Sequence, residues 1–473
     1  MESIIKGLSD SQIEQVRRTT DDILEDVGFR VGHGGIRELC GVAGAKVDEA
    51  SQIVRLPRQL VGELLAQAPS VLTISDVSGA EIEIGGGHAP RYHAIVTDPW
   101  IINYPSGEPR PPCLDDVKRN TALAHRLGPV AVLSLMDYPV FDVEGPGSNL
   151  HAMRAHILHH AKHHLVCPAS VESFDRWLRV GEILSTGSTA QAGKIMSVAV
   201  AVISPLILSE LNGDLLMRAC ERDMAVFPTI CATAGSTAPY SVAANILLGN
   251  VETIFLAAIT QLVRPGTPFV YRFAPSVAQL RSVEALYYTL DKVKWNIASV
   301  QLGKSYGLPT TSECGGAMTW RHDGQTGAEG VLSMLAAHCS GADFFSGIGS
   351  TYNAVGMSPE TMLIQTAWMQ AAMHLGRGID TSDDLLGAES IRRAGPGGEF
   401  LTDELTLELM RGDEFFSCDL LDYSGSMLHE PSMLERAHAR VQELVEGFES
   451  PLPAEVQEQV RRFFRDECGI LDE

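Results

Sequence analysis

The sequence predicts an α/β fold: a (β/α)8 TIM barrel with a helical N-terminal cap and a helix-rich C-terminal tail. Short β-branched or apolar runs alternate with amphipathic stretches, and eight such runs occur. The runs are apolar at nearly every position, which is typical of strands in a parallel sheet that helices cover. Eight strand–helix units favour a closed barrel over an open, doubly wound sheet.

Residues 1–90 are predicted to form a helical cap and a small flanking sheet. Ser9 and Gln12 have the spacing of a capping box, and apolar residues follow at helical intervals until Gly28. Residues 71–84 alternate between apolar and polar and end at three glycines, which predicts a pair of strands.

The barrel is expected over residues 91–395. Its predicted strands are Ala94–Thr97, Val130–Met136, Leu165–Ala169, Ile195–Ile203, Ala225–Ala232, Pro268–Phe273, Pro309–Glu313 and Asp343–Gly347. Helices are predicted between them at Asp115–Leu127, Leu150–Lys162, Ser209–Cys220, Val242–Leu262, Val283–Ser305 and Gly327–His338. The first strand has an alternative, because residues 101–108 fit a hairpin of the flanking sheet equally well. The barrel would then need another strand after residue 378.

A Gly-Pro-Gly-Gly sequence at 395–398 ends this region. The polar, helix-rich tail at 396–473 is expected to pack on the barrel.

Composition and charge exclude several classes of protein. Lys and Arg number 36 against 59 Asp and Glu, a formal charge of −23, which would repel nucleic acid or an anionic membrane. The longest apolar stretch, Ile195–Leu208, is too short to span a bilayer. The N-terminus has no signal-peptide pattern and the nine cysteines are scattered singly, so we expect a cytoplasmic protein with reduced thiols.

Six histidines fall within residues 151–164. On a helix His156, His160 and His163 would share a face, where neutral imidazoles could bind a metal. The group lies in the C-terminal half of a helix that leads into a strand, at the barrel end opposite the usual catalytic face. The sequence therefore predicts a solvated helix end, and no metal site.

Residues 313–325 have the composition of an active βα loop. They follow a predicted strand, are rich in glycine, and include Glu313, Arg321 and His322. Aromatic residues also occur near the predicted strand ends. Ring faces can hold a quaternary ammonium, which has no N–H group to donate. Zinc bound by Cys314, His322 and Glu313 is an alternative, although their spacing matches no strong zinc pattern.

Four sequence stretches, spread in order over nearly the whole chain, resemble one known family. They are residues 8–14 with 25–31, residues 204–206, residues 234–239 with 250–252 and 261–268, and residues 391–401. The family is the trimethylamine methyltransferase family of corrinoid-dependent methyltransferases. The resemblance is to its branch without pyrrolysine, which is typified by glycine betaine methyltransferases.

The resemblance implies a barrel whose open face docks a separate corrinoid protein, to whose Co(I) a methyl group passes from an amine. Ordinary residues stand at 316–323, where the pyrrolysine of other members lies. A quaternary amine, glycine betaine or a related betaine, is therefore expected rather than trimethylamine. The cobalt-ligating string Asp-x-His-x-x-Gly is absent, so the corrinoid is expected on a partner protein, with no metal in this chain itself.

This chemistry needs no protein nucleophile or acid, because a neutral tertiary amine leaves. Alignment and electrostatics would supply the catalysis. The expected aromatic walls are Tyr92, Phe273, Trp320 and Phe345, and the expected polar anchors are Glu313 and His322. Arg272 and Arg321 are further candidates for a substrate carboxylate. A homo-oligomer is expected. Two alternative functions remain: a zinc-dependent methyltransferase barrel that activates a thiol through Cys314, His322 and Glu313, and a non-catalytic quaternary-amine-binding protein.

Overall fold

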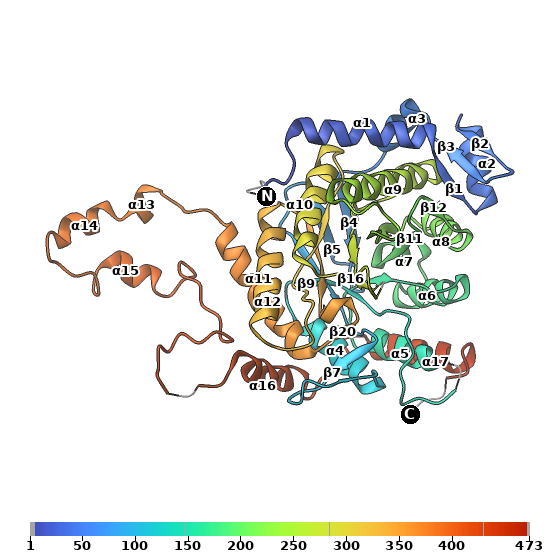
Figure 1. Cartoon of the computed structure of the whole chain (residues 1–473). Helices are drawn as coiled ribbons and strands as arrows, with labels where there is room; N and C mark the ends of the chain where they lie inside the picture. The colour runs from blue at the N-terminus through green and yellow to red at the C-terminus, as the bar shows by residue number, and fades with distance from the viewer. Residues whose placement is uncertain (1–4, 146, 283, 429, 471–473) are drawn as a thin grey trace.

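The computed structural model describes residues 5–145, 147–282, 284–428 and 430–470. A parallel sheet lies at the centre, and helices cover its outer face (Figure 1). An N-terminal group of helices and short strands packs along one side, and an arm extends from the other.

The central sheet has seven strands in the order β13-β11-β10-β9-β6-β18-β17, all parallel. They are β6 (Arg91–Ile95), β9 (Val130–Ser134), β10 (His163–Val166), β11 (Met196–Val202), β13 (Ala225–Ile230), β17 (Thr311–Glu313) and β18 (Phe344–Ile348). Each lies at or next to a predicted strand. The α/β class with a parallel sheet is therefore confirmed.

The one remaining predicted strand, at 268–273, lies between the two outer strands of this sheet. Single parallel bridges join Phe269 to Val226 of β13 and Tyr271 to Thr310 beside β17. The Val270 amide donates to the Val226 carbonyl at 3.1 Å, and the Tyr271 amide to the Pro309 carbonyl at 2.7 Å. The sheet is thus strongly curved, and this segment contacts both of its edges.

The first predicted strand, at 94–97, belongs to the central sheet. The alternative, in which the barrel needs another strand after residue 378, is therefore wrong. Strand β6 lies between β9 and β18. The hairpin of β7 (Trp100–Ile102) and β8 (Pro109–Arg110) joins a separate sheet with β19 (Ser350–Thr351) and β20 (Gly356–Met357). A 3-10 turn at Tyr352–Ala354 links β19 to β20. No strand follows β20 in the described residues.

An antiparallel pair covers the amino end of the central sheet. It consists of β4 (Val71–Ser75) and β5 (Glu81–Gly85), as the alternating pattern predicts. Its buried side chains Leu72 and Ile74 pack with Val132 and Phe344 of the sheet in one apolar cluster. Because this end is filled, a ligand site is expected at the opposite end, where the strands finish.

Helices form the outer layer (Figure 1). They are α4 (Leu114–Arg126), α5 (Ser148–Leu158), α6 (Val171–Leu184), α7 (Thr189–Ile195), α8 (Glu210–Glu221), α9 (Val242–Val263), α10 (Leu290–Ser305), α11 (Gly324–Cys339) and α12 (Pro359–Gly376). Helix α10 begins later than predicted, because residues 285–286 form strand β16. Position 283, where its start was predicted, lies outside the described residues.

The N-terminal region begins with α1 (Asp10–Asp26), whose capping box joins Ser9 and Gln12 as predicted. Gly28 follows it with a φ of +78°, a conformation that side chains disfavour. The other elements are β1 (Phe29–Val31), α2 (Gly34–Val42), β2 (Lys46–Asp48), β3 (Ile53–Arg55), α3 (Arg58–Leu65) and β12 (Ile207–Leu208). Helices α1 and α3 both pack on α9. Helix α9 is long and apolar enough to span a membrane, but 72% of its most apolar window is buried, which marks it as a core helix.

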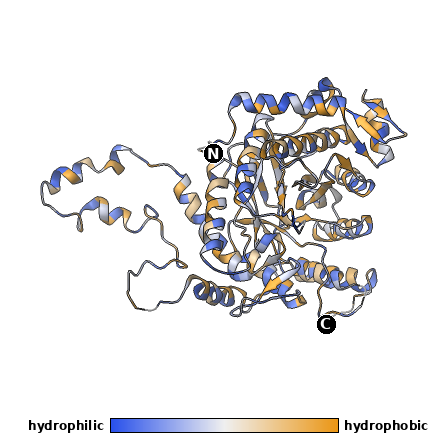
Figure 2. Ribbon diagram, viewed as in Figure 1, coloured by the Kyte–Doolittle hydropathy of each residue, from blue (hydrophilic) through white to orange (hydrophobic). Residues whose placement is uncertain are grey.

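The C-terminal region divides into an arm and two packed helices. After α12 the chain leaves the body as an extended arm with α13 (Asp383–Leu386), α14 (Ala388–Ala394) and α15 (Glu404–Leu409) (Figure 1). Hydrophobic residues are interspersed along it, and Ile379, Leu401 and Phe415 are exposed (Figure 2). The chain returns as α16 (Met433–Val445), which packs on α12 and α4, and α17 (Ala454–Asp466), which packs on α5 and α6.

The expectation of a solvated histidine-rich helix end is wrong. The side chains of His156, His160 and His164 are buried, and burial lowers the pKa of each imidazole. Trp177 of α6 lies against His156 and His164, and Phe448 of the C-terminal region lies against neighbouring histidines. Segments distant in sequence therefore cover this turn, which the local pattern does not reveal.

Candidate active site

Four polar side chains meet where β17 ends, and we call them the Glu313 cluster: Glu313, Arg272, Lys292 and Tyr287. The Lys292 ammonium lies 2.8 Å from Glu313 Oε2, and Arg272 Nη2 lies 3.1 Å from Oε1. The Tyr287 hydroxyl donates to the same carboxylate at 2.8 and 2.9 Å. The protein therefore fully satisfies this carboxylate.

Different elements supply these side chains. Glu313 is the last residue of β17, and Arg272 directly follows the bridged residue Tyr271. Lys292 lies in the first turn of α10, and Tyr287 directly follows β16. The short loop between β16 and α10 brings Tyr287 and Lys292 together, with the ammonium 2.9 Å from the centre of the Tyr287 ring.

The Glu313 cluster carries a net positive charge. Burial alone would raise the pKa of Glu313, but the Lys292 and Arg272 charges outweigh it and lower that pKa to about 2. Burial lowers the pKa of Lys292 to about 8, against the opposing effect of Glu313. At pH 7 two cations thus surround one anion, in a setting where unpaired charge is costly.

A second buried carboxyl, Asp98, follows β6 at the same end of the sheet. Its side chain is 5% exposed, and its Oδ2 has no hydrogen-bond partner among the described residues. Burial raises the pKa of Asp98 to about 8, and a hydrogen bond from Ser350 opposes this only partly. Asp98 is therefore a carboxyl group that lacks a counter-charge.

Two tyrosines lie close to Asp98. Burial raises the pKa of Tyr288 well above its usual range, and both Glu313 and Asp98 raise it further, so this ring lies near both carboxyls. A side chain at Gly316 would approach the Tyr288 ring to about 2.2 Å, which explains the glycine. Tyr138, after β9, is 37% exposed, and its pKa is raised by burial and by Asp98.

Comparison with known proteins identifies the family. The family described as Trimethylamine methyltransferase (MTTB) matches residues 2–467. The chain belongs to this family.

Similar proteins include the glycine betaine methyltransferase of Desulfitobacterium hafniense (strain Y51), 26% identical over 96% of each chain. The trimethylamine methyltransferase MttB of Methanosarcina barkeri (strain Fusaro / DSM 804) is 24% identical over 84% of this chain and 82% of its own. Among solved structures, the monomethylamine methyltransferase MtmB of Methanosarcina barkeri aligns over 92% of each chain, with a TM-score of 0.46 and 11% identity.

In this methyltransferase the predicted polar residues do not all lie together. Arg272 and Glu313 form an ion pair at the sheet's carboxyl end. His322 lies elsewhere, with its Nε2 2.8 Å from the hydroxyl of Tyr352. Arg321 is exposed and pairs with Asp323.

The structure does not bring the four predicted aromatic residues together. Tyr92 and Phe345 stack on each other in the core, where the Tyr92 hydroxyl bonds His338 of α11. Phe273 is buried against Gly249 of α9. Trp320 stacks on Tyr352 at a centroid distance of 5.5 Å. The first three fill space between sheet and helices because their side chains point outward from the strands.

The alternative zinc ligands are also separate. Glu313 is occupied by Arg272 and Lys292, whereas the buried Cys314 thiol faces the Ser346 carbonyl at 4.0 Å. Among the residues that the structure describes, Cys314, His322 and Glu313 do not form a group that could hold a metal.

Sequence reasoning missed Lys292, Tyr287, Tyr288 and Asp98. For Asp98 a signal existed, because an acidic residue directly follows the predicted strand 94–97. For Lys292 there was little signal, because a lysine in the first turn of an amphipathic helix is usually solvated.

Proposed function

We propose that this protein transfers a methyl group from a quaternary amine, glycine betaine or a related betaine, to the Co(I) of a corrinoid carried by a separate protein. The observation that carries the proposal is the uncompensated carboxyl of Asp98 at the same end of the sheet as the net-positive Glu313 cluster. A betaine carries both a cation and a carboxylate, so its charges are opposite in sign to the groups available at this end of the sheet.

The cation would bind at Asp98, whose charge raises the pKa of both Tyr138 and Tyr288. A quaternary ammonium can be held only by charge and by aromatic faces, and this position offers both. Arrival of the cation would favour the ionised form of Asp98, because opposite charge lowers a carboxyl pKa.

The substrate carboxylate would bind toward Arg272 and Lys292, whose two charges exceed that of Glu313 by one. A guanidinium and an ammonium supply strong charge-assisted hydrogen bonds to a carboxylate. The site would thus fix both ends of the substrate and turn its methyl group outward.

The chain's residues would bind and orient the substrate and exclude water. The corrinoid, when docked, supplies the nucleophilic Co(I), and a neutral tertiary amine leaves, so the protein need not supply a proton. Fixed charges and alignment lower the barrier under these conditions.

Exposed apolar side chains support docking of a partner at this end. Four such residues are more than half exposed. Phe141 follows β9, Ile203 follows β11, Tyr240 follows β14 (Thr233–Ala234), and Leu280 follows β15 (Ser276–Ala278). Scattered apolar residues are normal on a surface, but exposed aromatic residues such as Phe141 and Tyr240 are enriched in protein interfaces.

We further propose that the curved sheet is a closed eight-stranded barrel, with residues 268–274 as its eighth strand. The bridges of Phe269 and Tyr271 to the two outer strands support this.

The division of the chain into domains at residues 90 and 395 stays a proposal, as do the homo-oligomer and the cytoplasmic location. The exposed apolar residues of the arm support an oligomer.

The test is a spectroscopic assay with reduced cobalamin. Glycine betaine should convert cob(I)alamin to methylcobalamin in the presence of the purified protein, and trimethylamine should not. Preference for trimethylamine would reject the substrate class. Tight betaine binding without methylation of cobalamin or of a corrinoid protein from the same genome would favour a binding protein.

A further inference from the structure

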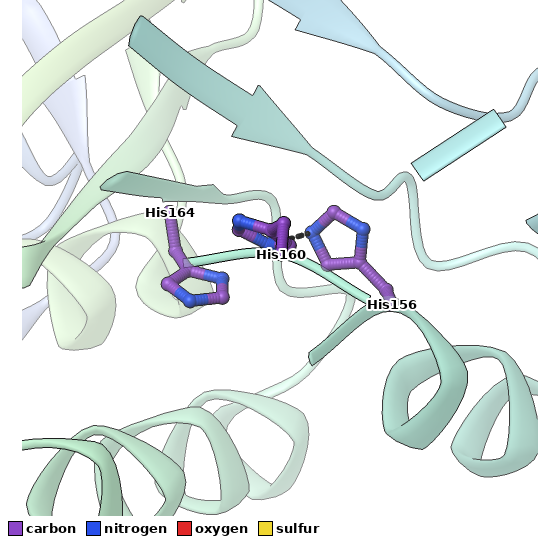
Figure 3. Close-up of side chains that lie close together, drawn as sticks. All are labelled: His156, His160 and His164. Atoms are coloured by element: carbon purple, nitrogen blue, oxygen red, sulfur yellow. Dashed lines mark hydrogen bonds between the residues drawn. The ribbon is translucent and has the colours of Figure 1, made fainter. Parts of the chain in front are cut away.

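Three buried histidines lie together outside the candidate active site, and we call them the histidine cluster: His156, His160 and His164 (Figure 3). His156 is near the end of α5, His160 is in the following turn, and His164 is the second residue of β10. One nitrogen of each lies within 4.8 Å of the others.

Hydrogen bonds define the tautomers of two of these rings. The Lys162 amide donates to His160 Nδ1 at 3.1 Å, so the proton of a neutral His160 is on Nε2. This Nε2–H donates to His156 Nε2 at 3.1 Å (Figure 3), and His156 Nδ1–H donates to Thr121 Oγ1 at 3.2 Å. His156 therefore already presents an unprotonated Nε2 toward the centre, with its other nitrogen oriented as in metal-binding histidines.

The burial of His164 without hydrogen-bond partners is unexplained by the contacts of the described residues. Neither of its nitrogens has a hydrogen-bond partner in the described part of the chain, although its side chain is 1% exposed. An unsatisfied buried polar group costs free energy, and native structures contain few of them. A ligand that accepts the lone pair of His164 would remove this cost.

We propose that His156, His160 and His164 bind a divalent transition-metal ion, with Zn²⁺ as the first choice. Imidazole nitrogens suit zinc, at bond lengths of about 2.0–2.1 Å, which require the nitrogens to lie about 3.3 Å apart. The His156 and His160 nitrogens are already 3.1 Å apart. His164 offers the third nitrogen, which lies within 4.8 Å of the other two and must move closer to them to bind the same ion.

Metal binding changes one tautomer. The proton of His160 must move from Nε2 to Nδ1, because Nε2 then binds the ion, and the Lys162 amide loses its acceptor. No proton enters or leaves the protein in this step. The site lies at the amino end of β10, at the opposite end of the sheet from Asp98 and Glu313, so the ion would stabilise the fold and would not take part in methyl transfer.

The test is metal analysis of the full chain without a polyhistidine tag. Inductively coupled plasma mass spectrometry should find one zinc per chain after dialysis against zinc, and Co²⁺ should give the visible absorption of a tetrahedral site. His164→Leu and, independently, His160→Gln should lower zinc affinity at least tenfold. The exposed His88, which pairs with Glu83, supplies the matched control His88→Leu, which should keep the zinc.

Two further measurements separate a metal site from packed neutral histidines. Zinc should raise the melting temperature of the wild type and not that of His164→Leu, and it should speed hydrogen exchange at the Lys162 amide. Zinc absent from the wild type, or retained equally by both cluster variants, would overturn the proposal. None of these readouts depends on methyl transfer, so the result is independent of the proposed function.

Discussion

Two buried carboxyls at the same end of the sheet differ in their partners, and their pKa values shift in opposite directions. Glu313 accepts from Lys292, Arg272 and Tyr287, and these partners lower its pKa to about 2. Asp98 has one hydrogen bond, from Ser350, and burial raises its pKa to about 8. One carboxyl is an ion held by the protein, and the other is a neutral acid at pH 7.

The difference indicates which group is available to a ligand. A carboxylate with three partners cannot change partners without leaving buried cations unpaired. A carboxyl with an unpartnered oxygen gains from any cation that reaches it. The comparison therefore supports the proposed roles, in which Glu313 organises the site and Asp98 recognises the substrate cation.

The largest expected effect is on stability, from Glu313→Gln. This change leaves Arg272 and Lys292 buried around a neutral group, and breaking a buried pair in this way typically costs about 3–5 kcal/mol. Urea denaturation monitored by circular dichroism measures it. Glu389→Gln, which breaks an exposed pair with Arg392, should change the free energy of unfolding very little. Equal stability of both variants would contradict the assigned role of Glu313.

The next largest effect is on substrate binding, from Asp98→Asn. The variant should raise KM for a betaine roughly 30-fold, or about 2 kcal/mol, because the cation loses its counter-charge in a buried position. Its fold should be at least as stable as the wild type at pH 8. Asp115→Asn, at an exposed pair with Lys118, is the control. An unchanged KM would place the cation elsewhere.

The two carboxyls should also give opposite pH dependences of stability. The pKa of Glu313 is lowered on folding, so its contribution to stability is present above about pH 4.5 and is lost as the pH falls through about 2. The pKa of Asp98 is raised on folding, so the folded state keeps a proton that the unfolded state releases, and stability falls as the pH rises from about 4 to about 8.

The free energy of unfolding, measured between pH 4 and pH 8, checks the predicted effect of Asp98. The stability of Asp98→Asn relative to the wild type should increase between pH 4 and pH 8. A constant difference would mean that Asp98 is ionised in the folded protein.

The smallest effects distinguish the two aromatic groups. Tyr138→Ala should weaken binding of any quaternary ammonium by about 1–2 kcal/mol if its ring borders the proposed cation site, as the effect of Asp98 on the pKa of Tyr138 supports. Trp320→Ala should weaken it by less than about 0.5 kcal/mol, because Trp320 stacks on Tyr352 and contacts a different group. Isothermal titration with glycine betaine measures both, and the reverse order would restore the loop after β17 as the cation site.

The sequence by itself determined the order and type of the main elements. Continuous apolar runs such as 196–202 and 225–230 can be buried on both faces only in a covered parallel sheet, so each became a strand next to its neighbour. The chain order also placed Glu313 and Arg272 at the carboxyl ends of predicted strands, where parallel strands bring side chains together. These features follow from local periodicity, which a single sequence contains.

Only the tertiary structure decided which side chains are partners. Tyr92, Phe273 and Phe345 became core residues because each points from a strand toward a helix, a direction that periodicity alone did not define. Lys292 became a buried ion-pair partner because the loop from β16 to α10 turns it toward β17. The histidine cluster became buried because Trp177 of α6 packs against His156 and His164, and Phe448 from the C-terminal region packs against the neighbouring His159. Burial and pairing depend on contacts between residues far apart in the chain, and these contacts set the cost of a charge or an unsatisfied nitrogen.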